Sequence, residues 1–200
     1  MVAIIDYGLG NLASVQKALS ILKIESKITN DHNEIKNASF ILLPGVGSFA
    51  HGMSNLREKR LDTVLTEEII GNKKNFIGIC LGMQLIAETG TEPQETKGLG
   101  WIKGTVKKIE SDHLRIPHMG WNNISVKNEL YLKGCDGKDF YFIHSYHFVP
   151  QDSSVIAATV NYGTDLVAAV QQDNIFATQF HPEKSQQAGL EMLKQYFEQC

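Results

Sequence analysis

The sequence predicts an α/β fold with a doubly wound, mostly parallel central sheet and an added antiparallel, strand-rich part. In the first half of the chain, short apolar runs alternate with helix-like segments, which is typical of a parallel sheet covered on both faces. From residue 101 to residue 179 the pattern changes to closely spaced alternating strands, which indicates antiparallel pairing. With 200 residues, of which 42% are hydrophobic, the chain can bury a full core. We therefore expect a single domain over residues 1–200.

The first half is predicted to contain three strands and three helical segments before the central strand. We expect a strand over 2–5, a helix over 11–23, a strand over 24–29, a helix over 31–36, a strand over 39–43 and a helix over 48–70. Asp31 suits the N-cap of the second helix, and Pro44 ends the third strand. The long helical segment is predicted to break near Arg60 and to end at Gly71.

The second half begins with a buried strand over 76–79 and a helix over 81–87, followed by a polar loop over 88–98. Strands are expected over 105–109, 166–170 and 175–180, with a turn at 171–174 between the last two. Ser185 suits the N-cap of a closing helix, whose buried face would contain Leu190, Leu193 and Phe197. The last strand would then carry His181 to the carboxyl edge of the sheet, where Cys80 is also expected.

Composition excludes several function classes. A net charge of -3 without long like-charge blocks argues against nucleic-acid binding. No apolar tract reaches the roughly 18 residues of a membrane span, and the chain begins directly with a strand instead of a secretory signal, so we expect no membrane partner and a cytoplasmic location. Cys80, Cys135 and Cys200 form an odd set without metal-ligand spacing, so we expect reduced thiols, no metal and no cofactor.

Cys80 is the candidate nucleophile. It lies between Gly78 and Gly82, at the point where a buried strand runs into a helix. Small residues on both sides allow the strained turn called a nucleophile elbow, and the N-terminus of the following helix favours thiolate. Most free cysteines are small buried core residues, and that interpretation stays open for Cys80 on this motif alone.

A cysteine nucleophile needs a base, and His181 is the histidine with a suitable companion. An apolar strand ends at His181, and Glu183 follows two residues later, so both side chains point the same way in extended backbone. A carboxylate beside an imidazole fixes its tautomer and stabilises the imidazolium that forms when it takes the thiol proton. The two segments together predict a Cys80, His181 and Glu183 triad.

Six separated segments carry a family resemblance: 6–12, 44–49, 78–84, 117–122, 142–146 and 180–185. They resemble class I, triad-type glutamine amidotransferases, and among these the glutaminase subunits of imidazole glycerol phosphate synthase, in order and over nearly the whole chain. The resemblance implies a flavodoxin-like fold and hydrolysis of glutamine to glutamate and ammonia through a cysteinyl thioester. It also implies a heterodimer in which ammonia passes to a cyclase subunit that makes imidazole glycerol phosphate and AICAR in histidine biosynthesis.

The same resemblance assigns further residues. The backbone amides of Val46 and Leu81 would hold the oxyanion, and glycines beside Val46 let its N–H approach a reacting carbonyl. Glutamine would be bound by Gly47, Gln84, His144, Ser145 and Tyr146, and the cyclase would be contacted by Asn11, Trp121 and Lys184. Ser48 and His147 depart from the residues usual in the family, outside the triad.

Three other functions stay open on the sequence. A paralogous glutaminase would feed ammonia to a sugar-modifying enzyme of surface polysaccharide synthesis with unchanged triad chemistry. A non-catalytic scaffold on the same fold is disfavoured by the intact Cys80, His181 and Glu183 set. A stand-alone hydrolase of γ-glutamyl peptides is disfavoured by the missing secretory signal and by the proposed interface residues around the site.

Overall fold

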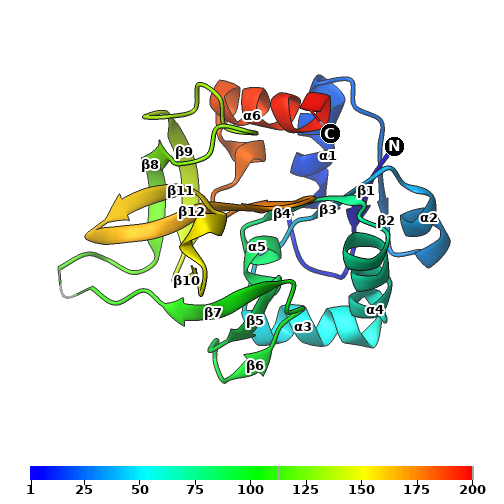
Figure 1. Cartoon of the computed structure of the whole chain (residues 1–200), viewed down its shortest axis with the longest axis horizontal. Coiled ribbons are helices and arrows are strands. Elements are labelled where there is room, and N and C mark those ends of the chain that lie inside the picture. The colour runs from blue at the N-terminus through cyan, green and yellow to red at the C-terminus, as the bar shows by residue number, and fades with distance from the viewer. Residues whose placement is uncertain (112, 200) are drawn as a thin grey trace.

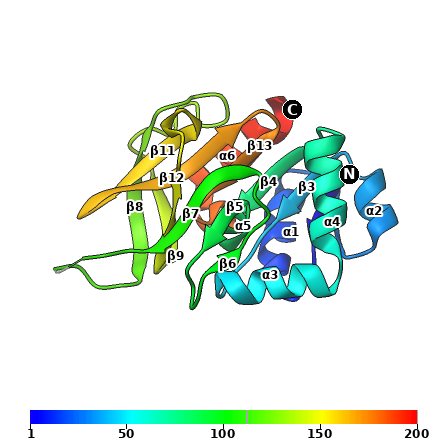
Figure 2. The same cartoon turned by 60° about the horizontal axis from the view of Figure 1, so that its bottom comes forward.

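The structure is a computed structural model that describes residues 1–111 and 113–199. The described residues form a nine-stranded sheet in the order β2-β1-β3-β4-β13-β12-β11-β8-β9 and a four-stranded sheet in the order β10-β7-β5-β6 (Figure 1). Helices pack on both faces of the larger sheet, and the smaller sheet lies to one side of it (Figure 2).

Five parallel strands make up the first part of the large sheet. They are β1 (Val2–Ile5), β2 (Ser26–Thr29), β3 (Phe40–Leu43), β4 (Asn75–Ile79) and β13 (Ile175–Thr178). Their spatial order matches the flavodoxin-like arrangement, in which ligands bind beyond the carboxyl ends of the strands. The predicted doubly wound, mostly parallel sheet is confirmed.

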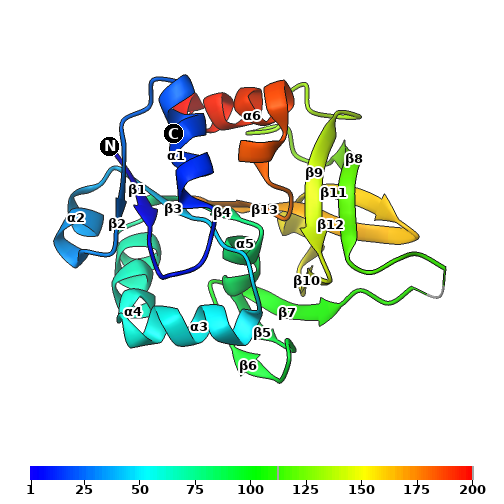
Figure 3. The same cartoon turned by 180° about the vertical axis from the view of Figure 1, so that it is seen from behind.

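Alternate side chains of the buried strands enter two separate cores. Val2 and Ile4 of β1 pack with α1 (Leu12–Ile21) and α6 (Gln186–Gln199), whereas Ala3 and Ile5 pack with α3 (Phe49–Glu58) and α4 (Leu61–Thr66). The two helix pairs are seen above and below the sheet in Figures 1 and 3. This two-sided burial explains why the strands are continuous apolar runs.

Antiparallel strands extend the large sheet beyond β13, as predicted for the second half of the chain. They are β12 (Thr164–Gln172), β11 (Ile156–Tyr162), β8 (His118–Val126) and β9 (Asp139–His144). A 3-10 turn over Ser153–Val155 precedes β11. The smaller sheet contains β5 (Ala87–Gly90), β6 (Thr96–Lys97), β7 (Ile102–Lys108) and β10 (Tyr146–Pro150). Together these strands cover the end of the parallel sheet where β4 and β13 finish.

Helix boundaries follow the predicted caps and breaks. Asp31 accepts hydrogen bonds from the Asn33 and Glu34 amides and so caps α2 (His32–Asn37). The helical segment after residue 48 breaks at Arg60, whose φ of 54° is left-handed, and a π-helical turn over Glu67–Gly71 ends it.

Three local predictions were wrong. The expected loop over 88–98 contains most of β5 and all of β6, and the helix after Cys80, α5 (Leu81–Leu85), stops before residue 87. Backbone pairing with β7 holds this polar segment in strand form, so it carries no apolar signal. The hydroxyl of Ser185 donates to the His181 carbonyl at 2.6 Å and accepts from the Tyr141 amide at 3.0 Å, instead of capping α6.

Candidate active site

Cys80 lies in a strained turn between β4 and α5. Its φ of 54° and ψ of -106° place it among the few non-glycine residues with left-handed backbone. A Cβ on Gly78 would lie 2.9 Å from the Gly82 carbonyl oxygen, and a Cβ on Gly82 would collide with the Leu43 carbonyl. Both flanking glycines are therefore required by close backbone approach, which agrees with the predicted elbow.

His181 and Glu183 form a buried pair beside this turn. His181 lies three residues after the end of β13, and Glu183 lies in a 3-10 turn over Pro182–Lys184. His181 Nδ1 lies 2.7 Å from Glu183 Oε1, with both side chains almost fully buried. The other ring nitrogen, Nε2, is buried and makes no hydrogen bond with any described residue. The carboxylate thus fixes the ring and leaves Nε2 available for proton transfer.

The charge on Cys80 acts on His181. Burial disfavours the imidazolium and alone would lower the pKa of His181. Negative charge on Cys80, together with the hydrogen bond and charge of Glu183, opposes burial and raises that pKa to about 10. Negative charge on the sulfur therefore favours the imidazolium form of His181.

A cleft of about 430 Å³ opens over the Cys80 sulfur. Its lining includes nine of the predicted site residues, namely Val46, Gly47, Cys80, Leu81, Gln84, His144, Ser145, Tyr146 and Lys184. The side chains of His181 and Glu183 are buried and do not line the cleft. Asn11 and Trp121 lie outside the cleft.

The two amides predicted to hold an oxyanion are not both aimed at the cleft. The Leu81 N–H donates to the Gly45 carbonyl at 3.4 Å. In a trans peptide the carbonyl and the next N–H point in opposite directions, so the Val46 N–H points away from Leu81. Rotation of the one peptide plane between Gly45 and Val46 would release the Leu81 amide and turn the Val46 amide toward it.

The comparisons with known proteins agree with this geometry. Residues 3–200 match the family described as glutamine amidotransferase class-I. The chain belongs to the class-I glutamine amidotransferase family. It is 46% identical over 199 residues to "Imidazole glycerol phosphate synthase subunit HisH 1" of Campylobacter jejuni, with 98% of each chain covered.

Two other similar proteins illustrate the range of the family. "Imidazole glycerol phosphate synthase subunit HisH" of Pelagibacter ubique is 42% identical over 203 residues, with 98% of each chain covered. The solved structure of PurLQS from Thermotoga maritima has a TM-score of 0.75 at 20% identity and covers 99% of this chain and 95% of that one. The second likeness supports the glutamine amidotransferase fold alone.

Residues that the sequence analysis missed also line the cleft of this glutamine amidotransferase. They are Ser48, Glu92, Pro117 and Ile143. Glu92 accepts a hydrogen bond from the Phe49 amide at 3.2 Å, which caps α3, and burial raises the pKa of its carboxyl. Because Glu92 follows a polar stretch without periodicity, only the contact between β5 and α3 could have brought it to the site.

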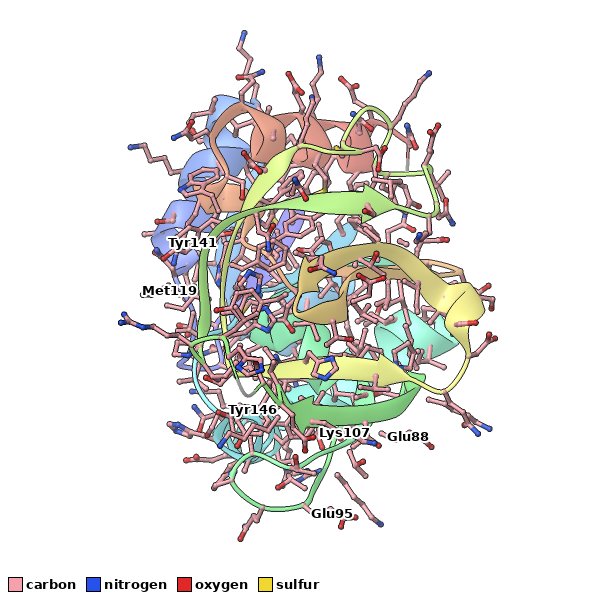
Figure 4. All side chains as sticks on the ribbon, turned by 90° about the vertical axis from the view of Figure 1, so that its left-hand side faces the viewer. Glu88, Glu95, Lys107, Met119, Tyr141 and Tyr146 are labelled. Atoms are coloured by element: carbon pink, nitrogen blue, oxygen red, sulfur yellow. The ribbon has the colours of Figure 1, made fainter. Side chains whose placement is uncertain are left out.

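The residues predicted to meet a partner lie at the surface around the cleft. Trp121 on β8 is 48% exposed and packs edge-on against Tyr141 of β9, and the Lys184 ammonium lies 5.7 Å from the centre of the same tyrosine ring. Met119 and Tyr141 lie along one edge of the molecule in Figure 4. The Asn11 side chain caps α1 by accepting from the Ser14 amide at 3.3 Å, which gives it a structural role as well.

No group of three or more metal-ligating side chains occurs within residues 1–111 and 113–199. None of the helices in this part of the chain has the length and apolar character needed to cross a membrane. Cys135 is free and buried, whereas Cys200 lies outside the described residues.

Proposed function

We propose that the chain is the glutaminase subunit of a two-protein imidazole glycerol phosphate synthase in the cytoplasm. In this proposal it hydrolyses glutamine and passes the ammonia to a cyclase, which makes imidazole glycerol phosphate and AICAR in histidine biosynthesis. One observation supports this proposal most strongly. His181 Nδ1 and Glu183 Oε1 form a buried contact of 2.7 Å, and the strained turn at Cys80 opens into a single cleft. The names of the relatives, at 41–46% identity over nearly the full chain, support the pathway over the paralogous sugar-modifying one.

The chemistry proceeds in two halves. His181 Nε2 takes the Cys80 thiol proton, and the sulfur attacks the side-chain carbonyl carbon of glutamine. His181 then gives its proton to the amide nitrogen, the C–N bond breaks, and ammonia leaves a glutamyl thioester. Water attacks the thioester while His181 takes one of its protons, and the C–S bond breaks to return the thiol and release glutamate. Glu183 keeps the imidazole in the required tautomer throughout.

The cleft offers groups for the rest of the glutamine molecule. The Glu92 carboxylate is the anionic group that complements the α-ammonium, and Lys184 at the rim complements the α-carboxylate. The backbone of 144–146 together with Gly47 and Gln84 provides the hydrogen-bonding groups that fix orientation.

The partner surface is the outer face of the β8 and β9 pair. Met119 and Trp121 point to this face because they are two residues apart on β8, and they pair with Ile143 and Tyr141 of β9. Met119 is 62% exposed and Ile143 is 37% exposed. Such a group of exposed apolar side chains is typical of a protein interface. Ile143 also lines the cleft, so a partner bound on this face would receive ammonia directly.

The test uses the chain reconstituted with a cyclase. We expect Cys80→Ala to abolish glutamine-dependent turnover while added ammonium salt still supports the cyclase. Iodoacetamide or a glutamine-like electrophile should label Cys80 ahead of Cys135 and Cys200. Equal labelling of the three cysteines, or undiminished glutamine-dependent turnover in Cys80→Ala, would refute the nucleophile assignment. Glutamate release from γ-glutamyl peptides without a partner would favour the stand-alone hydrolase.

A further inference from the structure

Gln179 is a buried glutamine between β13 and His181, and it stands outside the motifs that predicted the other site residues. Its side chain is 0% exposed and does not line the cleft. Gln179 Oε1 accepts from Gln84 Nε2 at 3.0 Å, and Gln179 Nε2 donates to the Cys80 sulfur at 3.7 Å. One amide therefore contacts both the nucleophile and a residue that forms the cleft wall.

A backbone carbonyl dictates the orientation of both glutamine amides. The Tyr146 carbonyl can only accept, so the group facing it at 2.9 Å must be Gln84 Nε2. The second N–H of Gln84 then requires an acceptor, which is Gln179 Oε1, and this turns Gln179 Nε2 toward Cys80. With both hydrogens used, Oε1 is the polar atom that Gln84 retains for a ligand, and no described residue donates to it.

Two neutral histidines are hydrogen-bonded in series to the same Tyr146 carbonyl. His144 Nδ1 donates to the Tyr146 carbonyl at 2.9 Å, so His144 Nε2 accepts from His118 Nδ1 at 3.0 Å. His118 Nε2 in turn faces the amide nitrogen of Asn122 at 3.4 Å. Burial lowers the pKa of His118 to about 4 and that of His144 to about 3, so both rings are uncharged at neutral pH. In this series of hydrogen bonds each group donates in the direction of the Tyr146 carbonyl, so all the assigned protons are mutually consistent.

We propose that Gln179 is a further functional residue of the glutaminase reaction, because it holds Gln84 with its Oε1 presented to the cleft and donates a hydrogen bond to the reacting sulfur. The inference rests on the proposed function. Through the first contact Gln179 is a positioning residue, since it acts on the substrate by way of Gln84. The Gln84 oxygen selects a ligand with an N–H donor at that point, which glutamine provides. Through the second contact Gln179 stabilises negative charge on the sulfur.

Two readouts separate the two contacts. The KM for glutamine is measured in the complex with the cyclase, and the rate of Cys80 alkylation by iodoacetamide at neutral pH is measured on the isolated chain. Gln179→Met, which keeps the length and removes all polar atoms, should raise KM about tenfold, as expected for the loss of one hydrogen bond to a substrate-binding group. The same variant should slow alkylation about threefold, because the thiolate loses a donor.

Gln84→Met and the double variant complete the cycle. Gln84→Met should raise KM by as much or more, with alkylation at the wild-type rate. The double variant should have the KM of Gln84→Met and the alkylation rate of Gln179→Met, since coupled residues are not additive. The double variant leaves no buried amide without a hydrogen-bond partner at these two positions. If Gln179→Met fails to fold, alkylation is therefore measured on the double variant. Gln151→Met, at an exposed position, is the matched control and should match wild type in both readouts.

Wild-type KM and wild-type alkylation in a folded Gln179→Met would overturn the proposal, as would multiplication of the two KM effects in the double variant. Failure of the proposed function is distinct from both results. In that case Cys80→Ala would retain glutamine-dependent turnover, whatever the Gln179 variants do.

Discussion

Replacement of Val46 by glycine should increase glutaminase activity in the absence of a partner. The Gly45 carbonyl occupies the Leu81 amide and the Val46 N–H points away from Leu81, so the two predicted oxyanion donors do not converge in the structure. Rotation of the Gly45 to Val46 peptide by about 180° changes ψ of Gly45 and φ of Val46 by opposite amounts. Because Val46 has a negative φ here, rotation carries it into the positive half, where a β-branched residue is strained.

The magnitude follows from that strain. Left-handed backbone costs an L-residue about 1 to 2 kcal/mol, and glycine adopts it at almost no cost. Val46→Gly should therefore populate the aligned state about 5- to 30-fold more, and glutamate release by the isolated chain should rise by the same factor. A single oxyanion donor is commonly worth about 10²- to 10³-fold in rate, so the partner would still activate the variant, by a smaller ratio than it activates wild type.

The assay compares glutamate release by the chain alone, with the cyclase, and with the cyclase and its nucleotide substrate. Val46→Ala is the control, because it removes the branch but keeps a Cβ and most of the penalty. We expect stepwise activation of wild type across the three conditions and a raised first value in Val46→Gly. Unchanged basal turnover in a folded Val46→Gly, or a gain equal to that of Val46→Ala, would refute the rotating-peptide mechanism. Equal kcat in all three conditions would rule out a partner switch.

Three further predictions test the site and its surroundings. Glu183→Gln should lower kcat by about 10²- to 10⁴-fold with little change in KM, since the imidazole loses its orienting charge; a kcat near wild type would remove Glu183 from the triad. The pKa of His181 is raised to about 10, so its contribution to the free energy of unfolding is fully present below about pH 6.5 and is lost as pH rises through 10. Urea titrations across this pH range should show a steeper loss of unfolding free energy in wild type than in Cys80→Ala. Trp121→Ala should weaken cyclase binding by roughly tenfold or more without slowing Cys80 alkylation; slower alkylation would mean that the change reaches the active site.

The chemistry that depends on short sequence spacing could be predicted from the sequence, and the chemistry that depends on packing could not. Gly78, Cys80 and Gly82 form one turn, and His181 and Glu183 are two residues apart, so each motif contains its own geometry. Glu92 and Gln179 reach the site only through tertiary pairing of distant strands, and neither belongs to a periodic pattern. Strand β5 was missed for the same reason, because its stability comes from pairing with β7.

The predicted triad and the predicted oxyanion donors differ in how far the structure prepares each for catalysis, and we infer that control acts on the oxyanion donors. His181 is already oriented by Glu183, and negative charge on Cys80 favours the protonated form of the ring. The Leu81 N–H, which is one of the donors predicted for an oxyanion, is blocked because it donates to the Gly45 carbonyl. We therefore expect the partner to act on the oxyanion donors instead of on the proposed nucleophile. It needs only to favour one peptide orientation by about 3 to 4 kcal/mol, within the differential binding that an interface can supply. If the partner controls oxyanion stabilisation in this way, glutamine is hydrolysed only when an acceptor for the ammonia is present.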